Sequence, residues 1–512
     1  MFLPKSTLPI LILVLSFLQV YSQGTGAGAI DIQDMKEHLT YLSSDELQGR
    51  SFETEVDGIN MAADYIAENA KRIGLEPAVP NYIQKVDMIA VKPDQEDFVE
   101  ISNVVGKTIY HSSSLIDMTG MIETHIRKNV RVVMAGFSQN FSKEKVEGKI
   151  VLLAQGNEED FKNDAFHWNN HFERTRIDSL SRQKPAAILI VTNPNDRKGK
   201  VYQQLSVWLN RERYSLAHDD KPETPVLIVL PELADNLLGG KGKYKKFLSK
   251  QVKNTATSPG LDDKTLTIRT GKVARKIEGK NIIGVVEGSD PVLKNEYVVF
   301  MAHYDHLGVN EDGDVYNGAD DNGSGTVAIM EVAEAFATLK EKPKRSMVFL
   351  WVTGEELGML GSSYYADHPV FSMEKTAVCF NLDMVGRVFE ERDTVWNNSP
   401  KKVKDFDGLF SLSNDVWPEL SDLNQQICSE LQLVPDTTLP DRFIRSSDHY
   451  SFSKNGVPIM NYATGYHADY HKVGDEVDKI SFEKMKRVVE LCFRMGMAVG
   501  NEQIIERKTA GK

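Results

Sequence analysis

The stretch VFLWVTGEELGMLGS, residues 348–362, joins a continuous apolar run to two adjacent carboxylates, Glu355 and Glu356. An apolar run without alternation is typical of a strand that is buried on both faces, as in a parallel sheet. Glycines follow the carboxylates and favour a turn at that point. Two like charges directly after a buried strand indicate a polar site at the carboxyl edge of a sheet, where ligands bind in α/β folds.

Similar apolar runs recur on both sides of this stretch and alternate with helical patterns. The runs include NIIGVVEG, EYVVFMAHYDHLG, TAVCFNLDMVG and VPIMNYATG. Helical patterns such as GTVAIMEVAEAFATLK and SFEKMKRVVELCFRMG accompany them. This alternation predicts an α/β fold in which a mostly parallel central sheet is covered by helices on both faces.

The pattern changes in the region from Lys107 to Lys276, where short apolar runs are separated by polar connections with few long helical patterns. These runs are VRVVMAGFS, KIVLLAQG, AAILIVTN and TPVLIVLP. We interpret the region as a β-rich module inserted into the main domain. The predicted organisation is a signal peptide at 1–22, a first part of the main domain at 30–112, the inserted module at 113–275, and a second part of the main domain at 276–505.

The N-terminus and the charge indicate where the protein acts. The basic start MFLPK, the short apolar core at 8–18 and the VYS pattern at 20–22 are typical of a cleavable signal peptide. No later run is long and apolar enough to span a bilayer, so we expect export to the periplasm or the extracellular space without stable membrane insertion. The net charge of −13, with no Lys/Arg stripe, argues against nucleic-acid binding.

Cysteines do not supply a metal site, because Cys379, Cys428 and Cys492 are far apart and odd in number. We expect them to be buried, with at most one bridge among them. Five segments instead carry or lead to His, Asp and Glu ligands: His303 and Asp305 in AHYDHLG, Asp320 and Asp321 in NGADDNGSG, Glu355 and Glu356 in TGEELG, Asp383 in NLDMVGR, and His471 in ADYHKVGDEVDKI.

The residue types indicate a reaction class. Two histidines and three carboxylates, one of them shared, suffice for two four-coordinate metal ions with a water molecule between them, and imidazole combined with carboxylate suits zinc. Two ions about 3.5–4 Å apart can bind a bridging hydroxide and activate it as a nucleophile. A carboxylate outside the ligand set is then needed as general base and acid.

At these motifs the chain resembles the dinuclear-zinc metallopeptidases of family twenty-eight, which include secreted bacterial aminopeptidases and glutamate carboxypeptidase. The similarity rests on ELQGR, the HxD of AHYDHLG, DDNGSG, GEELGMLGS, NLDMVGR and the final YH. The inserted module resembles a protease-associated (PA) domain at KIVLLAQG, AAILIV and TPVLIV.

The resemblance implies a role for each matching residue. His303 and Asp383 would bind one zinc ion. Glu356 and His471 would bind the other, and Asp321 would bridge both. We choose Asp321 over its neighbour because the bridging aspartate of the family lies three residues before the Ser of an SG pair, here Ser324 in the same segment.

Three further residues would act around the metals. Glu355 resembles the general base, and Asp305 resembles a carboxylate that orients the imidazole of His303. Tyr470 resembles the hydroxyl that stabilises the developing oxyanion.

Other polar residues near the motifs have structural explanations. Asp320 and Asn322 are expected to shape the turn, and Gly323 and Gly325 to let the next helix begin close to the metals. We expect structural or pocket-rim positions for His306, His449, His467 and Asp448. Arg387 and Arg445 could contact a substrate carboxylate, although ordinary salt bridges explain them equally well.

The leading hypothesis is a secreted zinc-dependent aminopeptidase that releases N-terminal residues from peptide substrates, with two zinc ions per chain. A carboxypeptidase of the glutamate carboxypeptidase type would use the same ligands but needs cations for the substrate carboxylate, and no arginine cluster stands out. A glutaminyl cyclase with one zinc ion and an inactive binding protein are further alternatives. The sequence leaves open the preferred N-terminal residue, the role of the inserted module and the oligomeric state.

Overall fold

The structure is a computed structural model, and it describes residues 26–103, 106–118, 124–138, 141–163, 168–196, 198–217, 224–255, 261, 264–388, 407–437, 441–502 and 505. The signal peptide predicted at 1–22 lies outside the described residues. Among the helices within them, none combines the length and the apolar character needed to cross a bilayer.

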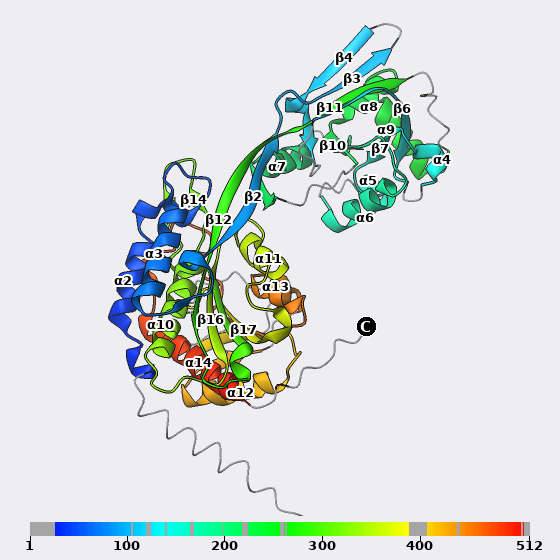
Figure 1. Ribbon diagram of the computed structural model, residues 1–512. Helices are drawn as coiled ribbons and strands as arrows, with labels where there is room; N and C mark the ends of the chain where they lie inside the picture. The colour runs from blue at the N-terminus through cyan, green and yellow to red at the C-terminus, as the bar shows by residue number, and fades with distance from the viewer. Residues whose placement is uncertain are drawn as a thin grey trace, which may run out of the picture. The chain divides into compact units, whose positions relative to one another are not determined.

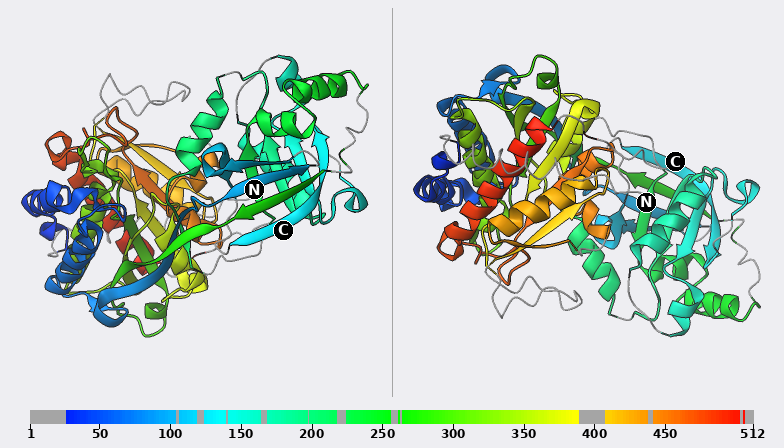
Figure 2. Two further views of the ribbon diagram at one scale, coloured as in Figure 1. Left: turned by 90° about the horizontal axis from the view of Figure 1, so that it is seen from above. Right: turned by 90° about the horizontal axis from the view of Figure 1, so that it is seen from below.

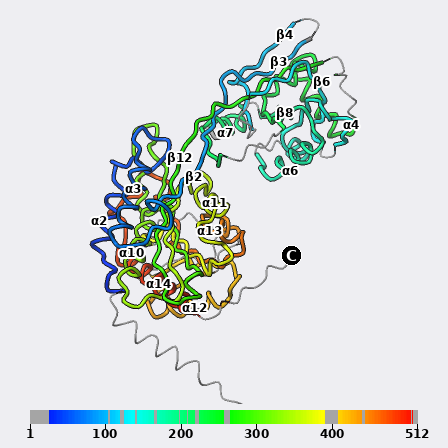
Figure 3. The backbone as a smooth tube through the Cα atoms, viewed as in Figure 1, coloured from blue at the N-terminus to red at the C-terminus, as the bar shows by residue number. Residues whose placement is uncertain are grey.

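The chain forms two compact units (Figure 1). One comprises the chain up to Asp87 and from Glu278 onward, and the other is the inserted stretch Met88–Ile277. The chain enters and leaves the inserted unit through two neighbouring strands, β2 (Ile83–Pro93) and β12 (Lys272–Val286) (Figure 3). The first part of the main domain ends before residue 112, where its end was predicted. Residues 98–111 instead form a hairpin that pairs with a strand of the inserted unit.

The sheet of the first unit is mixed, with parallel strands at its centre. Its order is β19 (Val434–Asp436), β18 (Gly408–Ser413), β20 (Ile459–Ala463), β17 (Thr376–Leu382), β13 (Tyr297–His303), β16 (Ser346–Val352), β12 and β2, with β1 (Glu76–Pro77) paired to β12. β9 (Arg213–Leu216) pairs with residues 88–91 of β2, and both of these segments belong to the inserted stretch. β20, β17, β13 and β16 are mutually parallel. The expectation of a mostly parallel sheet holds for these four strands, whereas β12 pairs antiparallel with β16 and β18 pairs antiparallel with β20.

Helices cover both faces of this sheet, as predicted. The apolar residues of β13 and β16 alternate between two cores because successive side chains point to opposite faces. One core packs against α2 (Ile32–Leu42), α3 (Gly58–Arg72), α10 (Gly325–Ala337), α12 (Glu419–Glu430) and α14 (Phe482–Asn501). The other packs against α11 (Leu360–Asp367) and α13 (His449–Ser453). Figure 2 shows α2 and α14, from opposite ends of the chain, on the same side of the sheet.

The three cysteines belong to the buried part of this unit. Cys379 lies in β17, Cys428 in α12 and Cys492 in α14. All three are buried and free, so no bridge links them. Their burial agrees with the expectation that they act as small apolar residues.

The inserted unit contains an eight-stranded sheet, in agreement with the β-rich module expected, together with more helices than the sequence indicated. Its sheet order is β4 (Gly106–His111), β3 (Phe98–Asn103), β11 (Thr265–Thr270), β6 (His125–Gly136), β7 (Ile150–Ala154), β8 (Ala187–Val191), β10 (Val226–Val229) and β5 (Leu115–Asp117). β6, β7, β8 and β10 are parallel. The sequence underestimated its helices because several of them are short or have few apolar residues.

These helices cover both faces of the parallel strands. One face packs against α5 (Glu158–Lys162), α8 (Pro231–Leu237) and α9 (Lys243–Val252). The other packs against α4 (Lys143–Val146), α6 (Asn170–Ser181) and α7 (Lys200–Leu209). The unit therefore has cores of its own.

Candidate metal centre

The parallel strands bring most of the predicted ligands to one edge of the sheet. His303 is the last residue of β13, Asp383 directly follows β17, and the Glu355-Glu356 pair lies in the turn after β16. These strands are parallel, so their carboxyl ends share an edge. Asp321 arrives from η7 (Ala319–Ser324), the turn that leads into α10. The fold thus gathers side chains from four separate segments.

A first group consists of His303, Asp321 and Asp383. The Nε2 atom of His303 lies 3.6 Å from Oδ1 of Asp321 and 3.5 Å from Oδ1 of Asp383. Tetrahedral zinc ligands at about 2.1 Å from the ion lie about 3.4 Å from one another. The three atoms therefore have the spacing that one zinc ion requires.

A second group shares Asp321. The Nε2 atom of His471 lies 3.1 Å from Oδ2 of Asp321 and 3.4 Å from Oε2 of Glu356. His306 also belongs here, because its Nδ1 lies 3.0 Å from Oε1 of Glu356 and 3.9 Å from Oδ2 of Asp321. Asp321 turns one oxygen toward each group. This is the arrangement of a carboxylate between two metal positions.

The turn that carries Asp321 is held from several sides. Both its own N–H and that of Asp320 donate to the buried carboxylate of Asp475, at 3.0–3.1 Å. Oδ1 of Asp320 accepts the N–H of Gly386 at 2.7 Å. The peptide bond between Asp321 and Asn322 is cis. The geometry agrees with the predicted role of Asp320 in shaping the turn, and it adds Asp475, which the sequence did not indicate.

Asn322 and Gly325 complete the turn. The side chain of Asn322 donates to the carbonyl of Leu382 at 2.9 Å and accepts the N–H groups of Gly325 and Met384. A Cβ at Gly325 would lie 2.3 Å from the carbonyl oxygen of Leu382. Only glycine therefore lets α10 begin this close to the end of β17.

The electrostatics of the site favour bound cations. Burial raises the pKa of Glu355 well above its usual range. Burial opposes a charge on His303, yet its hydrogen bond to Asp383 raises the pKa of the imidazole. For His471 burial is likewise outweighed, chiefly by Asp321, and its pKa rises to about 10. An excess of buried carboxylates holds protons on these groups, and divalent cations would neutralise the same charge. The imidazole and carboxylate donors fit zinc.

Asp305 contacts the two glutamates rather than the imidazole of His303. Its Oδ1 accepts the N–H of Glu355 at 3.1 Å, and its Oδ2 accepts the N–H of Glu356 at 3.2 Å. The Asp305 carboxylate is 3.8 Å from Nδ1 of His303, and the backbone carbonyl of Asp305 accepts from that atom instead, at 3.2 Å. The expected orienting contact therefore comes from the main chain, because the side chain is engaged by the turn after β16.

The ring of Tyr470 lies flat against His471, one of the predicted metal ligands. Its ring stacks on His471, with centroids 3.8 Å apart, and meets Tyr466 edge to face. Burial, and then the charge of Asp321, raises the pKa of Tyr470 above its usual range. The hydroxyl therefore keeps its proton and can act as a hydrogen-bond donor beside the ligand cluster.

Two of the neighbouring cations form ion pairs within the protein. The Nε2 atom of His467 lies 3.3 Å from Oδ2 of Asp320. Arg387 is buried, donates to Asp469 at 3.1 Å and lies 3.3 Å from Nδ1 of His467. An ordinary salt bridge thus explains Arg387, and His467 has the structural position that was expected.

The remaining residues lie on η9 (Asp441–Arg445) and at the start of α13. His449 is buried with Nε2 3.0 Å from the carbonyl of Phe443, and burial lowers its pKa to about 4. Burial raises the pKa of the neighbouring Asp448 to about 7. The exposed Arg445 lies over the ring of Tyr450. The protein itself therefore accounts for these three side chains.

Arg50, in the ELQGR segment, joins the loops around the site. It is buried, and its guanidinium donates to four backbone carbonyls, those of Leu42, Tyr304, Asn317 and Gly318. The carbonyl of Arg50 accepts the N–H of His306 at 3.2 Å. Sequence alone could not assign this role, since only the folded chain shows which carbonyls surround the guanidinium.

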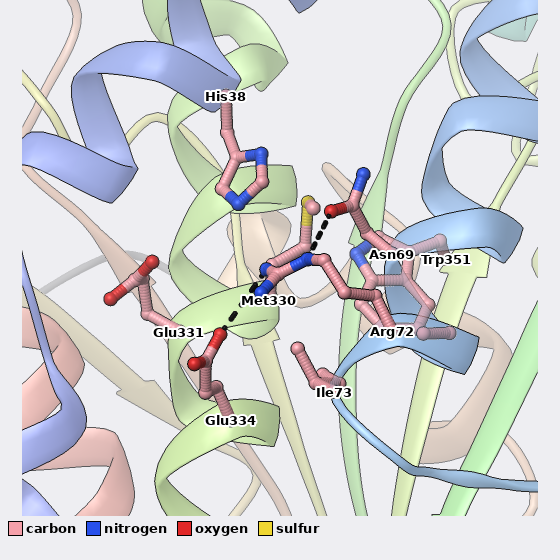
Figure 4. Close-up of a pocket in the computed structure, with 9 residues that line it drawn as sticks. His38, Asn69, Arg72, Ile73, Met330, Glu331, Glu334 and Trp351 are labelled. Atoms are coloured by element: carbon pink, nitrogen blue, oxygen red, sulfur yellow. Dashed lines mark hydrogen bonds and ion pairs between the residues drawn. The ribbon is translucent and has the colours of Figure 1, made fainter.

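A separate space lies between α2, α3 and α10 (Figure 4). His38, Arg72, Glu331 and Glu334 line it, with Arg72 donating to Glu334. It has no room for a water molecule. This space therefore does not offer a ligand site.

Part of the chain is similar to known peptidases. Residues 281–495 match the model of Peptidase family M28. Aminopeptidase YwaD of Bacillus subtilis is 31% identical over 222 residues, which cover 41% of this chain and 43% of that protein. Leucine aminopeptidase 2 of Arthroderma otae is 29% identical over 257 residues, 45% of this chain and 46% of that protein. The chain thus matches less than half the length of these curated relatives.

A likeness to a solved structure extends over nearly the whole chain. The aminopeptidase from Aneurinibacillus sp. strain AM-1 superposes with a TM-score of 0.53 at 17% identity, covering 95% of this chain and 98% of that one. At this identity the likeness concerns the fold, and it confirms the predicted α/β class.

Proposed function

Residues 281–495 belong to peptidase family M28, as the motifs predict. From this match we propose that the protein is a secreted zinc-dependent aminopeptidase with two zinc ions. His303 and Asp383 would hold one ion together with Asp321. Glu356 and His471 would hold the other, with Asp321 between the two ions. Relatives that carry the name aminopeptidase support the reaction class.

One observation carries the proposal. Asp321 is the only residue common to the two groups among the residues described, and its oxygens face the imidazole of His303 on one side and that of His471 on the other. A carboxylate that faces two histidines in this way is well placed to be shared by two ions. A single ion would leave one of the two histidine contacts unexplained.

The roles of the side chains follow from their positions. Bound zinc ions would activate a water molecule and polarise the scissile carbonyl. Glu355 is half-buried beside the proposed ligands and would take the proton of that water and return it to the leaving amine. Tyr470 would donate its hydroxyl to the carbonyl oxygen as charge develops there. Asp305 would hold the two glutamates in place.

The test is a substrate profile with free and blocked termini. Purified protein loaded with zinc would be assayed on aminoacyl-arylamides and short peptides, with and without a chelator. We expect release of the first residue from substrates with a free N-terminus, and loss of that release with an acetylated N-terminus or with chelator. Glu355→Gln is the control, because it keeps the shape of the side chain but cannot accept the proton.

The alternatives give different outcomes. Cleavage of N-blocked substrates from the C-terminus would indicate a carboxypeptidase, and conversion of N-terminal glutamine with one ion per chain would indicate a glutaminyl cyclase. The structure disfavours the first, because Arg387 is buried against Asp469 rather than free for a substrate carboxylate. If wild type and Glu355→Gln were equally inactive on every substrate, the proposal would fail.

We also propose that residues 88–277 form a PA-like unit and that residues 1–22 direct export. The export proposal rests on the pattern of the N-terminal residues alone. N-terminal sequencing of protein secreted from a bacterial host checks it, with the expected new terminus after Ser22.

A further inference from the structure

His306 lies inside the second ligand group, although the proposed set of ligands is complete without it. Its side chain is fully buried, and Nδ1 is 3.0 Å from Oε1 of Glu356. The opposite oxygen of that glutamate, Oε2, faces Nε2 of His471 at 3.4 Å. The two imidazoles therefore contact different oxygens of one carboxylate.

The ring of His306 is fixed in this place. Its backbone N–H donates to the carbonyl of Arg50 at 3.2 Å. The residue packs against Gly318, where a Cβ would lie 2.5 Å from Cδ2 of the imidazole. The positive φ of +55° at Gly318 also favours glycine there. The ring is thus held against Glu356 by backbone on two sides.

Two roles are chemically possible for Nδ1, and the other nitrogen separates them. If Nδ1 bound a metal ion, the proton of the neutral ring would lie on Nε2, which would need an acceptor. Among the residues that the structure describes, Nε2 of His306 is buried and has no hydrogen-bond partner. With the proton on Nε2, a buried donor lacks an acceptor and the carboxylate at 3.0 Å receives no hydrogen bond from Nδ1. With the proton on Nδ1, that hydrogen bond forms and Nε2 is left as an acceptor without a donor, so only the second arrangement gains a hydrogen bond.

We propose that His306 is a positioning residue that donates its Nδ1 proton to Oε1 of Glu356 and thereby leaves Oε2 for the second metal ion beside His471. This inference rests on the proposed two-metal site. A group that orients a ligand in this way usually changes metal affinity about 10- to 100-fold when it is removed.

Three substitutions separate the two roles. His306→Asn places an amide N–H near the position of Nδ1 and keeps the donor. His306→Gln moves the amide toward the position of Nε2, and His306→Ala removes it. Each purified variant would be titrated with zinc by calorimetry, and its Co²⁺ form would be examined by visible absorption. Circular dichroism would check that each variant folds.

We expect two ions to bind to wild type. One of them should bind about 10- to 100-fold more weakly in His306→Ala and His306→Gln, but within a few-fold of wild type in His306→Asn. The Co²⁺ spectrum at saturation should be the same in all variants, since no ligand is lost. If His306→Ala does not fold, the comparison of Asn with Gln gives the same distinction.

Other results would contradict the proposal in distinct ways. A loss in His306→Asn as large as in His306→Gln, with an altered Co²⁺ spectrum, would make His306 a ligand. Unchanged affinities in all variants would show that His306 does not position Glu356. If wild type bound no metal, the proposed function would fail as well, and the titration of wild type reveals this before any variant is compared.

Discussion

Glu355 and Glu356 are neighbours in the sequence but have different surroundings. Two imidazoles lie within 3.4 Å of the carboxylate oxygens of Glu356. Glu355 is half-buried, and burial is the largest cause of the rise in its pKa. The surroundings of the two carboxylates therefore differ in the way that their proposed roles require, with Glu356 as metal ligand and Glu355 as general base.

Substitution should separate these functions. Glu356→Ala should lose one zinc ion together with activity. Glu355→Ala should keep both ions and lose activity by about 100- to 10,000-fold, the usual contribution of a general base. Metal content by mass spectrometry of the dialysed proteins, measured beside peptidase activity, checks this. Equal loss of metal in both variants would overturn the assignment.

Asp305 gives a second prediction for a single residue. Its carboxylate accepts both N–H groups of the Glu355-Glu356 turn. Asp305→Ala should lower the free energy of unfolding by about 1 to 3 kcal/mol, because the two donors lose their acceptor. Asp305→Asn keeps one acceptor oxygen and should lie between wild type and Asp305→Ala in urea denaturation. An Ala variant as stable as wild type would contradict this role.

Between elements, Arg50 connects η3 (Asp45–Arg50) to the loops around the site. A lysine cannot reproduce its planar fork and would leave some of the four carbonyls unpaired. We expect Arg50→Lys to lower the free energy of unfolding by about 2 kcal/mol or more and to weaken zinc binding.

Arg72→Lys is the matched control for Arg50→Lys. Arg72 lies on α3 with a half-exposed side chain and pairs with Glu334. Exposed pairs contribute about 0–1 kcal/mol, so this change should have little effect on thermal unfolding or zinc affinity. A similar loss from both substitutions would mean that Arg50 has no special role.

The contact between α10 and the N-terminus of α2 predicts a dependence on pH. Glu331 of α10 is buried, accepts the N–H of Asp31 at 3.0 Å, and burial raises its pKa from 4.5 to about 8. Because the folded protein holds this proton more tightly than the unfolded chain, its contribution to stability is present below pH 4.5 and is lost as the pH rises toward 8.

Glu331→Gln removes that titration while keeping an acceptor for Asp31. Its stability relative to wild type should increase as the pH rises from 5 to 8.5, by up to a few kcal/mol at about 1.4 kcal/mol per pKa unit. Unfolding in urea at the two pH values measures this. Glu334→Gln, which is more exposed on the same helix, should show little change. The same change in both variants would refute the assignment.

At the scale of the whole molecule, two units with separate cores should unfold separately. The proposed metal ligands all belong to the unit that contains β13 and α10. Zinc at 100 times its Kd should stabilise that unit by about 2.7 kcal/mol, because it binds only the folded state. Calorimetry should show two transitions, of which zinc raises one. Glu356→Ala should remove that increase, and an equal rise of both transitions would contradict the division.

The sequence by itself determined the class of the fold and the ligand types, because both depend on local pattern. Unbroken apolar runs mark β13, β16 and β17, and polar residues at their ends must share an edge once the strands are parallel. The inserted unit was less predictable. Its hairpin of β3 and β4 and its polar helices depend on pairing and packing with distant strands, which a local pattern does not encode.

Only the tertiary structure decided which side-chain atoms lie within hydrogen-bond distance of one another. The sequence predicted His471 as a ligand and His306 as a structural or pocket-rim residue, and the fold gives each a different oxygen of Glu356. Asp305 could orient an imidazole or hold a turn, and the path of the chain after β16 directs its carboxylate to the turn. Hydrogen bonds form over about 3 Å, and residues 50, 155 or 254 positions apart reach that distance only when the whole sheet is assembled.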